Sequence, residues 1–351
     1  MSPGRPAILA VDGGNSKADA LLVDRSGSVL AAARHAAPAN VGRANGSVDS
    51  LAAVIRVVAR DSGVDLGARP VAPVGVYCLA GADSSGDERR IERALAGRGW
   101  TARNVIRNDT HAVLWTGTDR GWGVALVCGA GMNCLGVGPT GREVRFAALG
   151  ELSGDLAAGG EWVGLAALGA AVRARDGRGP RTVLEQTVPQ HFGMSRPEAV
   201  ARAMYDERLS RDRLVELPPT VFRAAASGDA VSRGILDRVA DEVVTMVAAT
   251  IARLHVTGRD VDVVLGGGMF RSGDQAFLDR VRSGIEAVAP RAHITTLALP
   301  PVVGAALLGL HEIGAGRRAQ VRLREAVENS ADAFGARSSS FSPEPVSSRE
   351  V

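Results

Sequence analysis

The chain has 351 residues, of which 46% are apolar and 23% are charged, so at ~150 residues per domain we expect a globular protein of two domains. Its net charge is +3 and its arginines are spread along the chain without a basic cluster, which argues against nucleic-acid binding. No stretch reaches the ~18 uninterrupted apolar residues of a membrane span, and the apolar run at 7–11 is too short for a secretory signal. Three cysteines are too few for a disulfide framework, so we expect a cytoplasmic protein.

Residues 7–33 predict three strands joined by two turns, and the same pattern returns over residues 124–146. The expected strands are 7–11, 18–23 and 28–33 in the first copy, and 124–128, 133–137 and 142–146 in the second. In both copies a glycine-containing turn comes first and a tight hairpin comes second. We interpret the pattern as a duplicated β-turn-β-turn-β unit.

The rest of the chain alternates strands with helices, which predicts an α/β layered fold with a mixed or parallel sheet. We expect strands at 74–79, 104–107, 261–265 and 293–297. We expect helices at 48–60, 88–96, 161–175, 181–191, 196–205, 219–226, 230–255, 275–288 and 302–313. From about residue 332 the Ser/Pro-rich composition predicts a disordered tail.

The first long turn, DGGNSK beginning at Asp12, has the composition of a loop that contacts phosphate. Gly13 and Gly14 allow backbone N–H groups to approach an anion, while Ser16 and Lys17 add further donors. Asp12 can hold a hydrated Mg²⁺ that shields the phosphates. The sequence contains no GxxxxGK[ST] loop and no GxGxxG after a strand, which excludes a P-loop kinase and disfavours dinucleotide binding.

Lys17 is the only lysine among the 41 basic residues. The occurrence of a single lysine at this position is compatible with chance. The alternative is that this turn needs a compact, flexible ammonium group rather than a planar guanidinium.

Two further glycine turns follow apolar strands. Gly129 and Gly131 end the strand that corresponds to the first strand of the chain, so a phosphate chain can be held from both sides. Gly267 and Gly268 follow the strand VDVVL and allow a flat group such as adenosine to approach the backbone. A tight strand-to-helix turn explains the second pair equally well.

Two aspartates are candidates for acid–base chemistry. Asp109 ends a strand that runs toward the expected cleft, where a carboxylate can accept a proton from a hydroxyl that attacks a γ-phosphate. The alternative is that Asp109 caps the helix that begins near Thr110. Asp155 lies in a Gly/Ala-rich loop and carries a similar ambiguity.

These segments together resemble the sugar-kinase/Hsp70/actin superfamily, and within it the N-acetylglucosamine kinases and the related BadF/BadG/BcrA/BcrD-type ATPases. The segments that carry the resemblance are DGGNSKADALLVD (12–24), NDTHA (108–112), VCGAGMNCLGV (127–137), GELSGD (150–155) and VVLGGGMF (263–270). The resemblance covers about residues 7–315. It implies an α/β protein with two ribonuclease-H-like lobes, the actin-like ATPase fold, with an ATP cleft between them and a second lobe enriched in helices.

The resemblance also implies domain boundaries and a function. The N-terminal lobe would span 1–114 and be completed by a C-terminal helix at about 303–330, the second lobe would span 115–302, and 332–351 would be the disordered tail. The implied activity is the ATP-dependent phosphorylation of an amino-sugar hydroxyl, with N-acetylglucosamine and its 6-phosphate as the leading pair. ATP and Mg²⁺ are the implied cofactors, and a homodimer is the family's expectation.

Each site residue has an implied role in this comparison. Asp109 would be the general base and Asp12 would position Mg²⁺. The phosphate and adenosine contacts would come from Gly13, Gly14, Ser16, Lys17, Gly129, Gly131, Met132, Gly267 and Gly268. The sugar would be held by Asn40, Asn133 and Asp155. The chain departs from the family where GAGMN replaces a loop with a threonine or serine, and where LAAGGEW follows Asp155.

Two other functions remain open on the sequence. A BadF-type ATPase activator would need surface cysteines to bridge a [4Fe–4S] cluster, whereas Cys78, Cys128 and Cys134 lie in apolar strands. A nucleotide-binding sensor without phosphotransfer is conceivable because the second loop lacks hydroxyl donors.

Overall fold

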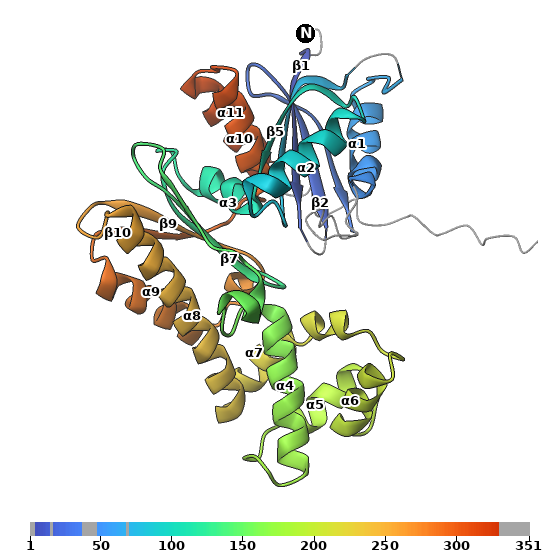
Figure 1. Cartoon of the computed structure of the whole chain (residues 1–351), viewed down its shortest axis with the longest axis vertical. Helices are drawn as coiled ribbons and strands as arrows, with labels where there is room; N and C mark the ends of the chain where they lie inside the picture. The colour runs from blue at the N-terminus through green and yellow to red at the C-terminus, as the bar shows by residue number, and fades with distance from the viewer. Residues whose placement is uncertain (1–3, 15–16, 37–47, 68–69, 330–351) are drawn as a thin grey trace, which may run out of the picture.

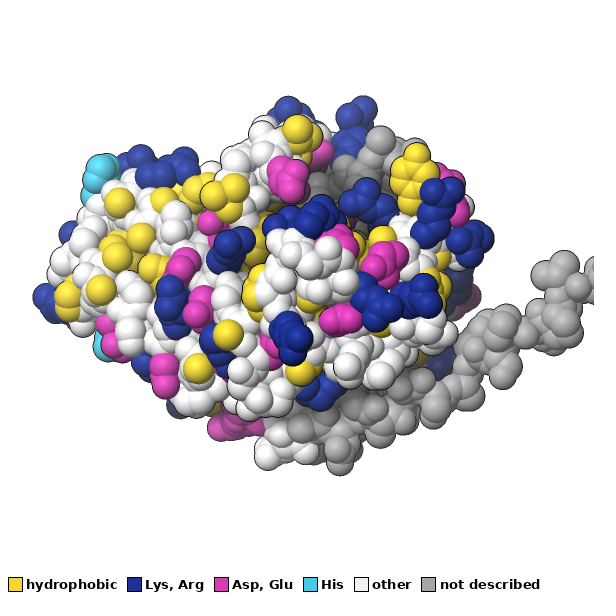
Figure 2. Space-filling view, turned by 90° about the horizontal axis from the view of Figure 1, so that it is seen from below, with side chains coloured by type: hydrophobic (Ala, Val, Ile, Leu, Met, Phe, Trp, Pro, Cys, Tyr) yellow, Lys and Arg dark blue, Asp and Glu magenta, His cyan; other side chains and the backbone are white. Residues whose placement is uncertain are grey.

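The computed structural model describes residues 4–14, 17–36, 48–67 and 70–329. Two five-stranded mixed sheets, each covered by helices, form two lobes (Figure 1). This arrangement confirms the predicted α/β fold with two lobes. No helix in the described ranges is long and apolar enough to cross a membrane. On the face drawn in Figure 2, basic and acidic side chains are interspersed.

The first sheet has the strand order β3-β2-β1-β4-β5. Its strands are β1 (Pro6–Gly13), β2 (Ala18–Asp24), β3 (Val29–His35), β4 (Ala72–Leu79) and β5 (Thr101–Arg107). β1 pairs antiparallel with β2 and parallel with β4, and β4 pairs parallel with β5. β1 is therefore the central strand, and the carboxyl ends of β1, β4 and β5 lie at one edge of the sheet.

Alternate residues of β1 enter two different cores, as the period of a strand requires. Leu9 and Val11 pack against α1 (Asp49–Asp61) and α2 (Ser85–Ala96). Ile8 and Ala10 pack on the opposite face, where the helices are α3 (Asp109–Gly117), α10 (Val302–Glu312) and α11 (Arg317–Glu328). The helices α10 and α11 thus return the chain from the second lobe to the first sheet.

The second sheet has the order β10-β9-β6-β7-β8. Its strands are β6 (Gly123–Cys128), β7 (Met132–Val137), β8 (Glu143–Arg145), β9 (Val261–Gly266) and β10 (Ala292–Thr296). Read from the other end, this order matches the first sheet strand for strand: three antiparallel strands followed by two parallel ones. The repeated pattern of the sequence therefore corresponds to the repeated half-sheet of the structure.

Most of the helices of the second lobe lie beyond β8. They are α4 (Gly160–Arg175), α5 (Leu184–His191), α6 (Pro197–Tyr205), α7 (Pro218–Ala226), α8 (Ala230–Leu254) and α9 (Gln275–Val288), with short 3₁₀ turns η1 (Gly150–Ser153), η2 (Arg211–Glu216) and η3 (Met269–Arg271). α4 to α7 extend away from the first lobe, as Figure 1 shows. Their apolar side chains join one core with β6 and β9.

The single helix expected at about 303–330 is two helices. α10 ends at Glu312, and Gly314, at φ +66°, adopts the left-handed conformation that commonly ends helices. The backbone N–H of Ala315 then donates to the carbonyl of Leu310 at 2.8 Å, and α11 begins at Arg317. A glycine in that conformation allows the chain to turn and lay α11 against the same face of the first sheet.

Helix α3 lies between the two lobes. Its Ala112 packs into the core of the first lobe, whereas Val113 and Leu114 pack against Ala125 and Val264 of the second sheet. A second contact joins the lobes where Arg145 of β8 donates to Glu88 of α2 at 2.7 Å. A cavity between the lobes is lined by residues at the carboxyl ends of β9 and β10 together with Lys17 and Arg34 of the first lobe.

Candidate active site

Three acidic residues gather where the parallel strands of the first sheet end. Asp12 lies on β1, Asp83 lies a few residues after β4, and Asp109 begins α3 directly after β5. The carboxyl ends of neighbouring parallel strands meet at one edge, and such edges are where ligands bind in α/β proteins.

Asp12 is a buried carboxyl group, with 9% of the residue exposed. It makes no hydrogen bond or ion pair with any residue in the described ranges. Burial raises its pKa to about 8, and the negative charges of Asp109 and Asp19 add to the effect. A carboxyl group in this state gains most from a bound cation, because a cation restores the charged form that burial disfavours.

Asp109 is not the cap of α3. The capping residue is Asn108, whose side-chain oxygen accepts from the Thr110 N–H at 3.0 Å and the Thr110 hydroxyl at 2.6 Å. The Asp109 carboxyl group is thereby free of the capping role that was the alternative. Burial, followed by the charge of Asp83, raises its pKa to about 7. A carboxylate with this pKa can accept a proton near neutral pH.

Asp83 joins this group, although its sequence context did not single it out. Its Oδ1 accepts a hydrogen bond from Nδ2 of Asn108 at 2.8 Å and another from Nδ2 of Asn133 at 3.1 Å. Asn133 lies on β7 of the second lobe, so this oxygen links the two lobes. Asn133 was predicted to contact a sugar, and the structure places it beside Asp83 and Asn108.

The turn after β6 presents an open backbone to the space between the lobes. The N–H of Gly129 donates to the carbonyl of Gly131 at 2.9 Å, which closes the turn. A Cβ at either glycine would meet no atom within 4 Å. By contrast, the side chain of the neighbouring Met132 is buried in the core, so only its backbone can serve a ligand.

Backbone hydrogen bonds from the first residues of α4 hold this turn in place. The N–H of Gly160 donates to the carbonyl of Gly129 at 2.8 Å, and that of Glu161 donates to the carbonyl of Ala130 at 2.9 Å. Gly159 has φ +86°, and a Cβ there would clash with the carbonyl of Gly131. The turn is therefore held rigidly with its opposite side unobstructed.

The two glycines after β9, Gly267 and Gly268, have different steric surroundings. Gly267 has φ +105°, and a Cβ would overlap the carbonyl oxygen of Cys128, so this position needs glycine for close packing. Gly268 is the residue just before η3, and a Cβ there would meet nothing within 4 Å. Of the pair, Gly268 is the one whose surroundings leave room for a ligand.

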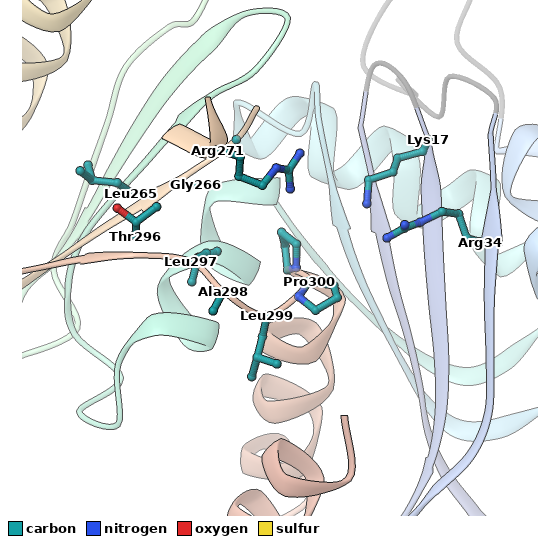
Figure 3. Close-up of a pocket in the computed structure, with 12 residues that line it drawn as sticks. Lys17, Arg34, Leu265, Gly266, Arg271, Thr296, Leu297, Ala298, Leu299 and Pro300 are labelled. Carbon is teal, nitrogen blue, oxygen red and sulfur yellow. The ribbon is translucent and has the colours of Figure 1, made fainter. Parts of the chain in front are cut away.

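A cavity of about 100 Å³ lies between the lobes and is lined by three basic side chains. Figure 3 shows Arg271 reaching from the second lobe toward Lys17 and Arg34 of the first. Lys17 and Arg34 both pair with the buried Asp19, at 2.5 and 2.6 Å. The side chain of Arg271 makes no hydrogen bond or ion pair with any residue that the structure describes. The surplus of positive charge makes the cavity suitable for an anion.

The other predicted site residues are placed as follows. Gly13 ends β1 and its carbonyl accepts from the N–H of Ala80 at 2.8 Å, while the N–H of Gly14 donates to the carbonyl of Lys17 at 2.9 Å. Asp155 is buried and accepts from the Ser153 hydroxyl at 2.6 Å. Within the described ranges no hydrogen bond joins Asp155 to Asp109 or Asn133. Ser16 and Asn40 lie outside the described residues.

No group of three His, Cys, Asp or Glu side chains able to hold a metal ion occurs in the part of the chain that the structure describes. The residues therefore do not form an all-protein metal cage. They do fit Mg²⁺ bound to a phosphate ligand, because Mg²⁺ is often held by one or two carboxylates together with substrate phosphates.

Comparison with known proteins identifies the relationship. Residues 9–309 match the BadF/BadG/BcrA/BcrD ATPase family. The chain belongs to this family. The resemblance drawn from the motifs is thereby confirmed.

Two curated proteins are similar to this family member. The N-acetyl-D-glucosamine kinase of Dictyostelium discoideum is 28% identical over 321 residues, which cover 87% of this chain and 98% of that protein. The N-acetylmuramic acid/N-acetylglucosamine kinase of Clostridium acetobutylicum is 26% identical over 233 residues, which cover 66% of this chain and 76% of that protein. Among solved structures, a Chromobacterium violaceum protein has a TM-score of 0.68 at 20% identity, covering 87% of this chain and 99% of that one. This likeness supports the two-lobed fold.

The site residues that sequence reasoning missed are Asp83, Arg34 and Arg271. Arg34 and Arg271 carry no local motif and reach the cavity only through the packing of the lobes. Asp83 carried one usable signal, because it follows an apolar strand as Asp109 does, and parallel strands end at a common edge.

Proposed function

We propose that this BadF/BadG/BcrA/BcrD family member transfers the γ-phosphoryl group of ATP to a hydroxyl of an amino sugar, with N-acetylglucosamine and its 6-phosphate as the leading pair. The observation that carries the proposal is the position of Asp109. Its carboxyl group, with a pKa of about 7, lies at the strand edge that faces the glycine turns of the second lobe. The names of the two curated relatives support the choice of acceptor.

The proposed nucleotide site uses both lobes. The open turn at Gly129 and Gly131 and the turn at Gly13 and Gly14 would let the backbone approach the phosphates. The N–H groups of Gly14 and Gly129 close their own turns, so the donors to phosphate would come from the other N–H groups of the two turns. Lys17, beside the same turn, would add positive charge. Asp12 would hold Mg²⁺, whose chemistry is to neutralise phosphate charge.

The proposed chemistry needs little more than positioning and one base. As the sugar hydroxyl oxygen attacks the γ-phosphorus, Asp109 accepts its proton, and the bond between that phosphorus and the β–γ bridging oxygen breaks. The products are ADP and the sugar phosphate. Asn133 and Asp155 would hold other polar groups of the sugar, so that the attacking oxygen faces ATP.

The alternative of an electron-transfer activator receives no support from the cysteines. Cys78, Cys128 and Cys134 are all buried, and burial raises the pKa of both Cys128 and Cys134 to about 12. Thiolates that bridge a cluster between subunits must lie at a surface and be deprotonated.

The lobe boundaries that we propose remain 1–114 with a C-terminal addition, and 115–302.

The test is a coupled assay of ADP release with MgATP and a panel of amino sugars. Release that increases with one or more sugars supports the kinase. Turnover that is independent of every sugar supports an ATPase activator, and ATP binding without turnover supports a nucleotide sensor. Either of the last two results would overturn the proposal.

A further inference from the structure

The Asp83 carboxylate lies where the two lobes touch, and its two oxygens have different surroundings. Oδ1 accepts hydrogen bonds from Asn108 of the first lobe at 2.8 Å and from Asn133 of the second lobe at 3.1 Å. Oδ2 makes no hydrogen bond with any residue in the described ranges. One oxygen is therefore occupied by the protein, and the other has no hydrogen-bond partner among the described residues.

A role in capping α2 does not explain Asp83. The N-cap of α2 is Ser84, whose side chain accepts from the N–H of Asp87, while the Asp87 side chain accepts from the N–H of Ser84. This reciprocal pair serves the first turn of the helix without Asp83. A role in an ion pair does not explain it either, because no basic side chain within the described ranges forms a salt bridge with Asp83.

The two amides that bind Asp83 are held in one orientation. Asn133 uses its side-chain oxygen to accept from the N–H of Cys134 at 2.8 Å, and Asn108 uses its own to accept from Thr110. In both residues the NH₂ group is left to donate to Asp83. The carboxylate thus fixes the predicted sugar contact Asn133 relative to Asn108, whose chain neighbour is Asp109.

The ionised form of the Asp83 side chain suits it to accept a hydrogen bond. Partial burial, followed by the charge of Asp87, raises its pKa to about 6, so the group is mostly ionised at neutral pH. An ionised carboxylate oxygen can accept a hydrogen bond but cannot donate one. The matching ligand group is a hydrogen-bond donor, such as a hydroxyl of the proposed sugar, and an anionic substituent at the same place would be repelled.

We propose that Asp83 is a further substrate-binding residue, whose Oδ2 accepts a hydrogen bond from a hydroxyl of the acceptor sugar while Oδ1 fixes Asn133 across the lobes. The proposal rests on the sugar-kinase function proposed above. It names a specificity determinant of that site: one hydroxyl of the acceptor, other than the one phosphorylated by way of Asp109, must be present and unsubstituted.

The experiment compares Asp83→Ala with the wild-type protein on the best sugar of the panel and on each of its monodeoxy analogues. The wild type should use one analogue ~10–100-fold less well than the parent sugar in kcat/KM, as expected for a lost hydrogen bond to a charged group. Asp83→Ala should lose about that factor on the parent sugar and should no longer distinguish the two. The KM for ATP should not change. Asp65→Ala, which alters an exposed aspartate between α1 and β4, is the matched control.

Other outcomes distinguish failure of the inference about Asp83 from failure of the proposed function. If the variant loses activity on all sugars by one common factor, or discriminates among them as the wild type does, Asp83 has only a structural role and the inference is wrong. If the wild type shows no turnover with any sugar, the proposed function itself fails and the inference fails with it. If Asp83→Ala does not melt cooperatively, Asp83→Asn, which keeps an acceptor oxygen but removes the charge, is measured on the same panel and must show reduced discrimination.

Discussion

Asp12 and Asp109 lie close enough in the cleft for the negative charge of Asp109 to raise the pKa of the buried Asp12 carboxyl group. The two groups have different surroundings in one respect. Asp109 begins a helix beside Asp83 and Asn108, whereas the carboxyl group of Asp12, on the central strand, has no hydrogen-bond partner among the described residues. The first three predictions follow from the roles that we propose for these groups, Asp109 as the proton acceptor and Asp12 as the ligand of a cation.

The rate of sugar phosphorylation should increase with pH around neutrality. In the role that we propose, Asp109 can act as a base only when it is ionised, and its pKa is about 7. Below that pH we expect kcat to fall by about tenfold per pH unit, and above it to level off. A kcat–pH profile at saturating MgATP and sugar checks this, and a flat profile between pH 5.5 and 8 would contradict it.

Asp109→Asn should lower sugar-dependent ADP release by ~10²–10⁴-fold, the usual contribution of a positioned base. ATP affinity, measured by calorimetry, should remain near the wild-type value because Asn keeps the size of the side chain. Asp65→Asn provides a control, since the only hydrogen bond that the side chain of this exposed residue makes with the described residues is from the N–H of Gly67. Wild-type turnover in the Asp109 variant would show that the base is another group.

Asp12→Asn should stabilise the protein at alkaline pH while weakening the binding of MgATP. The folded pKa of Asp12, about 8, lies above its ordinary value of 3.8. Its contribution to stability is therefore fully present below pH 4 and is lost as the pH rises through about 8. We expect the Tm difference between variant and wild type to grow from pH 5 to pH 9, reaching at least ~2 °C. Thermal melts without nucleotide test this, and a difference that does not depend on pH would refute it.

Two glycine substitutions should separate packing from ligand access. Gly267→Ala forces a Cβ into the carbonyl of Cys128 at a positive φ, so we expect loss of stability by ~2–4 kcal/mol. Gly131→Ala meets open space, so the fold should stay stable while ATP affinity falls by ~10-fold or more. Melting curves measure the stability of both variants, and ATP titrations measure their affinity for ATP. Equal ATP affinity in Gly131→Ala and the wild type would mean that this turn does not approach the nucleotide.

Lys17→Arg tests the meaning of the only lysine. Its partner Asp19 also receives two hydrogen bonds from Arg34, at 2.6 and 3.0 Å, so the fold should tolerate the change. If a compact ammonium is needed, the KM for ATP should increase by ~10-fold with little change in Tm. An unchanged KM and kcat would assign the single lysine to chance.

The sequence predicted those parts of the molecule that depend on neighbours along the chain. The hairpins of β1 to β3 and of β6 to β8 follow from short-range turn chemistry, and the long α8 follows from helical periodicity. The glycine turns and Asp109 were recognised for the same reason, because each lies at a strand end that local patterning identifies. Asn108 was not recognised as the cap of α3, since Asn and Asp are both favoured at that position and only the geometry separates them.

The remaining features depend on residues far apart in the chain. The order of strands places the ends of β1, β4 and β5 side by side, and only this order brings Asp83 to Asp109. Only the packing of one lobe on the other brings Asn133 to Asp83 and Arg271 toward Lys17. Local propensity carries no information about these contacts, because they form when apolar faces distant in sequence are buried together.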